Sequence, residues 1–209
     1  SRGDDLMKWS AFVSGLGGLA VVQGSFSSTL AAKPEGERFV QYGKMHEVIG
    51  QQQHQGRVKL AELVKQHKYK GIIGCGFPAI IKEGEAQSAA NISKKWLGTN
   101  VIESFSLACN NPVEVLNDAD AAGLAEMRFG LGKAQKGVVV LITIGSGLGS
   151  ALFIDGKLVP NTEFGHMRLH GDIAEVYASS KARKLNDLSW ETWGERFNEY
   201  LHYLCRIIN

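Results

Sequence analysis

Residues 113–124 read VEVLNDADAAGL and contain an abrupt change of pattern. The mostly apolar residues 113–116 predict a strand. From Asn117 onward, acidic side chains stand at the start of an alanine-rich run, an arrangement that the helix dipole favours and that predicts a helix. A strand that passes directly into a helix is one unit of a mixed α/β fold.

On the C-terminal side of this stretch, the sequence predicts a strand and then a β-hairpin. The strongly β-branched residues 137–144 predict a strand that stops at Gly145. Residues 150–154 and 157–159 flank Asp155-Gly156, a dipeptide typical of tight hairpin turns. Two helices then close the chain, and the last is expected to bury one apolar face. That face contains Trp190, Trp193, Phe197, Leu201, Leu204 and Ile208.

On the N-terminal side, residues 69–77 form a short apolar run that predicts a buried strand, which Pro78 ends. Residues 58–64 repeat apolar side chains at helical spacing. Residues 11–30 are rich in Gly, Ser and Val and predict two strands joined by a glycine turn. The elements together predict two similar halves with a boundary near Cys109.

Composition narrows the possible classes of function. The chain has 209 residues and a formal net charge of +2, too little positive charge to predict a nucleic-acid or membrane-surface partner. No apolar run approaches the ~20 residues of a membrane-spanning helix, and the N-terminus lacks the pattern of a signal peptide. The three cysteines, Cys75, Cys109 and Cys205, lie far apart without metal-ligand spacing. These features predict a cytoplasmic protein without disulfides.

The glycine-rich residues 143–149 (TIGSGLG) are the first motif that could carry chemistry. A strand that ends in alternating glycines can turn backbone N–H groups toward an anion, because no side chains block the phosphate oxygens. The hydroxyls of Thr143 and Ser146 add hydrogen-bond donors. The alternative is a tight turn whose glycines only satisfy a positive φ, and the motif alone does not decide between the two.

Asn117-Asp118 is the second motif. A carboxylate at a strand-to-helix junction is most often an N-cap, and this is one interpretation of Asp118. In the other, Asp118 is a general base that removes the proton of an attacking hydroxyl, and Asn117 binds a neighbouring hydroxyl. Taken alone, the pair favours the cap.

Glu163-Phe164-Gly165-His166 is the third motif. Glu and His beside a small residue suit a sugar, whose hydroxyls each donate and accept hydrogen bonds. The alternative is a surface Glu and a structural His in a loop, which is commoner for an isolated motif of this kind. No second His or Cys at metal-ligand spacing supports zinc at His166.

Residues 15–20 (GLGGLA) form a fourth motif, which fits the glycine fingerprint of dinucleotide-binding domains. That fingerprint requires a following helix, whereas the residues after Ala20 are β-branched or rich in Ser and Gly. An NAD-binding domain is therefore the weakest alternative, and an assay of nicotinamide-cofactor binding would discriminate it.

The order and spacing of the first three motifs resemble the ROK family of sugar kinases, and within it the bacterial polyphosphate glucokinases and glucomannokinases. The resemblance runs from Gly71 to about Leu204 and is most specific around Asn117 and in residues 160–166 (PNTEFGH), which belong to the matching stretch 158–166. The other matching stretches are residues 76–78, 89–92, 95–99, 143–149 and 174–179. The resemblance implies an α/β fold of the actin-like ATPase (ribonuclease H-like) type. Residues 1–108 would form a small N-terminal lobe and residues 109–209 the C-terminal lobe.

The resemblance also implies an activity and roles for individual residues. The chain would move a phosphoryl group from polyphosphate or ATP to the 6-hydroxyl of glucose, with Mg²⁺ neutralising the transferring group. Asp118 would be the catalytic base. The sugar would contact Asn91, Asn117, Glu163, His166 and Glu175, and the donor's phosphates Gly17, Gly18, Thr143, Gly145, Ser146, Gly147 and Gly149. Mannose as a second sugar and a homodimer are compatible with the family.

The chain departs from the family pattern in three places. The family's N-terminal phosphate motif is Asp-x-Gly-Gly-Ser/Thr, and here Gly15 and Leu19 occupy the Asp and hydroxyl positions. Many members have a zinc-binding His and Cys cluster after Glu-x-Gly-His, but residues 167–173 contain no cysteine, so no zinc is expected. Because the chain begins with Ser1 and stops at Asn209, it is expected to be truncated, with an incomplete second lobe. A catalytically impaired sugar-binding relic or sensor is therefore the second hypothesis.

Overall fold

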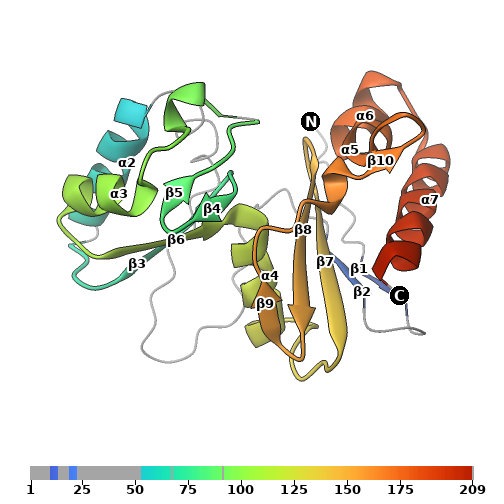
Figure 1. Cartoon of the computed structure of the whole chain (residues 1–209), viewed down its shortest axis with the longest axis horizontal. Coiled ribbons are helices and arrows are strands. Elements are labelled where there is room, and N and C mark those ends of the chain that lie inside the picture. The colour runs from blue at the N-terminus through green and yellow to red at the C-terminus, as the bar shows by residue number, and fades with distance from the viewer. Residues whose placement is uncertain (1–9, 14–18, 23–52, 67, 91, 209) are drawn as a thin grey trace, which may run out of the picture. The chain divides into compact units, whose positions relative to one another are not determined.

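The computed structural model describes residues 10–13, 19–22, 53–66, 68–90 and 92–208 (Figure 1). The chain divides into two compact units. We call residues 26–125 the central unit, and residues 1–25 with 126–209 the terminal unit. The division falls within helix α4, between Ala125 and Glu126. The boundary predicted near Cys109 lies inside the central unit, so the two predicted lobes do not coincide with these units. The lobes stay a prediction.

The central unit is built around two parallel strands and two helices that pack against each other. Its elements are α2 (Gln53–Gln66), β3 (Ile73–Phe77), β4 (Ile81–Lys82), β5 (Glu85–Ala86), η1 (Lys94–Trp96), α3 (Val101–Cys109), β6 (Val113–Asn117) and the start of α4 (Asp118–Phe129). β3 and β6 pair in register, with Phe77 opposite Asn117. The predicted strand at 113–116 and the predicted helix around 58–64 are confirmed. The strand predicted at 69–77 forms over 73–77, and it is not buried throughout, since Gly74 and Gly76 are exposed.

Three aromatic side chains form the centre of this unit's core. Phe77, Trp96 and Phe105 are fully buried and meet edge to face, with ring centroids between 5.0 and 6.1 Å apart. Each such pair contributes about 0.5–1.5 kcal/mol beyond the apolar area that it buries. Because Phe77 is the last residue of β3 and pairs with Asn117, this core fixes the end of the sheet from which α4 starts.

The terminal unit contains a five-stranded sheet in the order β1-β2-β7-β8-β9. These strands are β1 (Ser10–Val13), β2 (Leu19–Val22), β7 (Val138–Ile144), β8 (Leu148–Ile154) and β9 (Lys157–Val159). β2 and β7 are parallel, and the other neighbours are antiparallel. Asp155 and Gly156 have φ of 49° and 77°, the positive values that a tight turn between β8 and β9 needs, so the predicted hairpin is confirmed.

Strand β7 is buried on both faces. One set of its side chains packs with helices α5 (Ala174–Ala178) and α7 (Trp190–Ile208), and the other with α4 and β9. The first set is Val140, Ile142 and Ile144, and the second is Val139 and Leu141. The short elements between β9 and α7 are η2 (Phe164–His166), β10 (Arg168–Leu169), β11 (Asp172–Ile173) and α6 (Ser180–Leu185). Three helices therefore close the chain, where two were predicted.

Helix α7 is the predicted last helix, but its buried face is rotated from the predicted one. Trp193, Phe197 and Leu204 are buried as predicted, whereas Trp190 is 51% exposed. Tyr200, which the prediction omitted, is fully buried, and burial raises the pKa of its phenol. The Trp193 indole N–H donates to the main-chain oxygen of Ala178, which joins α7 to α5 (3.0 Å). Among the helices described, none combines the length and apolar character that crossing a membrane requires.

Candidate functional site

The junction of β6 and α4 in the central unit presents Asn117 and Asp118. Asn117 is 8% exposed, and its side-chain oxygen accepts the backbone N–H groups of Ala119 (2.8 Å) and Asp120 (3.2 Å). Its amide nitrogen donates to the main-chain oxygen of Ala79 (3.2 Å). Asn117 is therefore the N-cap of α4, because it satisfies two of the helix's unpaired N–H groups.

This geometry changes the interpretation of the second motif. The expectation that Asp118 itself caps the helix is wrong, since Asp118 is the first residue of α4. Its half-buried carboxylate accepts the adjacent N–H, that of Ala119, at 2.9 Å. Both lone pairs of the Asn117 side-chain oxygen accept the bonds of the cap, and one of its two amide N–H groups donates to Ala79. One amide N–H therefore remains for a ligand.

We expect Asn117→Ala to lower the free energy of unfolding by about 1–2 kcal/mol, because the cap of α4 is lost. Asn117→Ser should cost less, since a serine hydroxyl can still cap the helix while the bond to Ala79 is lost. Denaturant unfolding of both variants measures the difference. Equal stabilities of the Ala and Ser variants would contradict the capping role.

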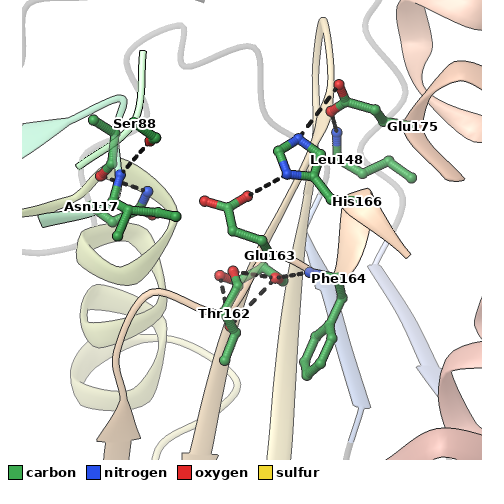
Figure 2. Close-up of polar contacts among 11 residues, drawn as sticks. Ser88, Asn117, Leu148, Thr162, Glu163, Phe164, His166 and Glu175 are labelled. Atoms are coloured by element: carbon green, nitrogen blue, oxygen red, sulfur yellow. Dashed lines mark hydrogen bonds and ion pairs between the residues drawn. The ribbon is translucent and has the colours of Figure 1, made fainter. Parts of the chain in front are cut away.

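In the terminal unit, the side chains of Glu163, His166 and Glu175 come together (Figure 2). The His166 ring lies between the two carboxylates, with Nδ1 3.7 Å from Glu163 Oε2 and Nε2 3.8 Å from Glu175 Oε1. These distances exceed those of direct hydrogen bonds. His166 is 43% exposed, so both ring nitrogens can serve a bound molecule. Alternating carboxylate and imidazole groups suit a ligand with adjacent hydroxyls.

Gly165 makes the close packing of this segment on β8 possible. A Cβ atom at Gly165 would lie 2.1 Å from the main-chain oxygen of Leu148. Any side chain would therefore push η2 away from the start of β8. Because η2 begins after Glu163 and ends with His166, this contact sets the position of both residues.

Glu175, in the first turn of α5, also contacts the glycine-rich loop. Its Oε2 accepts the backbone N–H of Leu148 at 3.3 Å, and a Cβ atom at Gly147 would lie 2.3 Å from the same oxygen. Neither Gly145 nor Gly147 has a positive φ. The alternative that these two glycines serve a positive-φ turn is therefore wrong, and Gly147 leaves room for the Glu175 carboxylate.

The loop at residues 143–149 connects β7 to β8, and two of its backbone N–H groups are already used. Gly145 donates to the main-chain oxygen of Gly147 (2.9 Å), and Leu148 donates to Glu175. Gly149 pairs with Thr143 in the sheet. Ser146 is exposed at the tip. An anion at this loop would depend mainly on the N–H groups of Ser146 and Gly147 and on the Ser146 hydroxyl.

Some predicted site residues fall on parts of the chain that the structure does not describe. Asn91, Gly17 and Gly18 lie outside the described residues. Leu19 begins strand β2, whereas the dinucleotide fingerprint requires a helix after its glycines, so this alternative loses its structural context.

Within the described residues, no three His, Cys, Asp or Glu side chains gather as a possible metal site. The absence of zinc stays a prediction. Burial raises the pKa of the Cys75 thiol on β3 to about 12. The raised pKa keeps this thiol protonated at neutral pH.

Comparison with known proteins identifies similar sequences and structures. Residues 46–183 match the sequence pattern of the ROK family. The chain is 41% identical over 143 residues to the polyphosphate glucokinase of Mycobacterium tuberculosis, which covers 68% of this chain and 54% of that protein. The chain thus spans about half the length of the curated relatives that it matches.

Two solved structures resemble this one. The first is the inorganic polyphosphate/ATP-glucomannokinase from Arthrobacter sp. strain KM, with a TM-score of 0.70 and 40% identity over 73% of this chain and 63% of the other. The second is a ROK family glucokinase from Streptomyces griseus in complex with glucose and AMPPNP. Its TM-score is 0.54, with 27% identity over 61% of this chain and 46% of the other.

Proposed function

The chain belongs to the ROK family, and we propose that it acts in the transfer of a phosphoryl group from polyphosphate or ATP to the 6-hydroxyl of glucose. The observation that carries this proposal is the placement of the His166 imidazole between the Glu163 and Glu175 carboxylates. The names of the relatives support the same reaction, because they combine glucokinase activity with polyphosphate or ATP. The predicted actin-like fold accords with the structures of these sugar kinases.

The three side chains would recognise the sugar through its hydroxyls. A hydroxyl can donate to a carboxylate and accept from an imidazole N–H at the same time. A hydroxyl beside His166 could thus accept from the ring nitrogen that carries the proton and donate to the neighbouring carboxylate. The separations of 3.7 and 3.8 Å between the ring nitrogens and the carboxylates are longer than direct hydrogen bonds. The remaining N–H of Asn117 and the side chain of Asn91 would bind other hydroxyls. Mannose is a second candidate acceptor.

Asp118 would be the general base of the reaction. Its carboxylate takes the proton of the 6-hydroxyl while the hydroxyl oxygen bonds to the terminal phosphorus of the donor. The bond between this phosphorus and the rest of the donor breaks, and the donor leaves one phosphate shorter. Such transfers depend mainly on positioning and on stabilisation of charge. The cap formed by Asn117 holds Asp118 at the start of α4 for this task.

Mg²⁺ is the metal ion that we expect to bind together with the phosphoryl donor. It commonly binds proteins through one or two carboxylates together with substrate phosphates, and Glu175 is one carboxylate that the terminal unit offers. Glu175 fits this donor set because its carboxylate lies against the loop at Gly147 and Leu148. When bound, the ion would neutralise charge on the transferring group.

Glucose 6-phosphate formation by the purified chain tests the proposal. We expect turnover that requires glucose, Mg²⁺ and at least one of ATP and polyphosphate, which are run side by side, with mannose as a second acceptor. Glucose binding is measured separately by calorimetry. Binding without turnover would favour the sugar-binding relic or sensor, to which Gly15 at the family's Asp position points. A chain that shows neither glucose binding nor turnover would contradict the proposal. A cytoplasmic location and a homodimer belong to the proposal as well.

A further inference from the structure

Ser150 on strand β8 connects to the residues on both sides of Glu163. Its side chain is buried, with the residue 1% exposed. Its hydroxyl donates to the main-chain oxygen of Thr162 (2.7 Å) and accepts the backbone N–H of Phe164 (3.0 Å). In return, the Thr162 hydroxyl donates to the main-chain oxygen of Ser150 (3.2 Å). Figure 2 shows these bonds below the Glu163–His166 pair.

We propose that Ser150 is a positioning residue that holds the carboxylate of Glu163 in the geometry that binds the sugar. This inference rests on the proposed function. One hydroxyl fixes the peptide groups before and after Glu163, so the backbone of Glu163 has little freedom to rotate. No side-chain cap bond at η2 uses the Glu163 carboxylate, which lies 3.7 Å from His166 Nδ1. The Ser150 hydroxyl therefore acts on the direction of this side chain through the Glu163 backbone.

The chemistry of the site explains why a hydroxyl is needed at residue 150. The main-chain oxygen of Thr162 and the N–H of Phe164 face the buried Ser150 side chain, and both groups need hydrogen-bond partners. A hydroxyl donates to one and accepts from the other, which no apolar side chain can do. Removing it leaves both groups without this partner, at a cost that is typical of broken buried hydrogen bonds.

Ser150→Ala tests the proposal, with Thr162→Val as the matched control. The control removes the Thr162 hydroxyl and its 3.4 Å contact with the Ser150 hydroxyl, but it leaves the bonds of the Ser150 hydroxyl to the Thr162 oxygen and the Phe164 N–H in place. We expect Ser150→Ala to weaken glucose binding about tenfold, the effect of losing one to two such bonds, with a donor KM within about twofold of the unchanged chain. Thr162→Val should keep the dissociation constant for glucose within about twofold of that of the unchanged chain, because the Thr162 hydroxyl does not hold the Phe164 N–H.

Hydrogen exchange without sugar gives a readout that does not depend on activity. The Phe164 amide should exchange faster in Ser150→Ala than in Thr162→Val. If Ser150→Ala fails to fold, Ser150→Cys keeps the site filled with a weaker hydrogen-bonding group and should show the same changes at smaller size.

Two results would overturn the proposal. The first is an unchanged exchange rate of Phe164 in Ser150→Ala. The second is an equal loss of glucose and donor affinity, which would indicate a general loss of structure. If the unchanged chain binds no glucose, the proposed function fails, and the exchange experiment still decides whether Ser150 holds the segment around Glu163.

Discussion

Asp118→Asn is expected to lower kcat for glucose phosphorylation by about 10²–10⁴-fold, the usual contribution of a general base. The dissociation constant for glucose should change by less than about twofold, because kcat falls when an interaction with the transition state is lost while ground-state binding remains. Asparagine has nearly the same shape as aspartate, and its oxygen can still accept the Ala119 N–H that Asp118 accepts now. It cannot accept the proton of the 6-hydroxyl.

Glu114→Gln is the control for this variant. Glu114 is an exposed carboxylate on β6, four residues before Asp118, so the control removes the same charge from the same strand–helix unit. We expect it to keep full activity. Rates are measured with a coupled assay for glucose 6-phosphate, and binding by calorimetry. If Asp118→Asn retains more than about one tenth of kcat, Asp118 is not the base.

Gly165→Ala is expected to disrupt sugar binding and to destabilise the terminal unit. The new Cβ would stand 2.1 Å from the main-chain oxygen of Leu148 and 3.0 Å from its carbon. Both atoms belong to the backbone at the start of β8, so η2 has to move instead. Overpacking of this kind costs about 1–3 kcal/mol. Because η2 carries His166 and follows Glu163, we expect glucose affinity to fall at least about tenfold, a change of about 1.4 kcal/mol.

Gly194→Ala is the control for the Gly165 variant. Gly194 lies in helix α7 of the same unit, and a Cβ there meets no atom within 4 Å. Alanine should stabilise this helix by about 0.5–1 kcal/mol and leave glucose binding unchanged. Thermal unfolding and calorimetry of both variants measure the two effects. A Gly165→Ala protein that binds glucose normally would show that the position of η2 does not control the site.

The local elements of the fold were predictable because their signals lie within a few residues. The change of pattern at Asn117 predicts the β6–α4 junction, and Asp155-Gly156 predicts the β8–β9 turn, whose positive φ values are observed. The family resemblance rested on the order of motifs and is confirmed by the match over residues 46–183. Helix α3 lies outside the predicted elements, although Val101, Phe105 and Cys109 repeat at helical spacing and Asn100 caps its start.

Contacts between distant residues were not predictable from the sequence. Spacing along α7 suggests an apolar face but not its rotation, so Trp190 was placed inside and Tyr200 was missed. Gly147 is needed because of Glu175, which lies 28 residues further along the chain. The sequence predicts a polar pair at Asn117-Asp118, yet only the hydrogen bonds show that Asn117 caps the helix.

The site residues also divide into those that the sequence predicted and those that only the structure reveals. Glu163, His166 and Glu175 were expected together, and the structure places them together, while their roles toward a sugar stay predictions. Ser150 was missed, since a lone serine in a strand carries no signal until its partners at Thr162 and Phe164 are known. The predictions for Asn91, Gly17 and Gly18 concern residues outside the described part of the chain.

The burial of β7 on both faces has a consequence for aggregation. Residues 138–144 read VVVLITI, with high β-propensity, no charge and no proline, the signature of a segment that pairs readily with other chains. In the folded unit, α5 and α7 cover one face of this strand, and Met127 at the end of α4 packs on the other. The nearest charge before it is the exposed Lys136, which can act as a gatekeeper against self-association. The yield of folded protein therefore depends on covering this strand before another copy of the chain pairs with it.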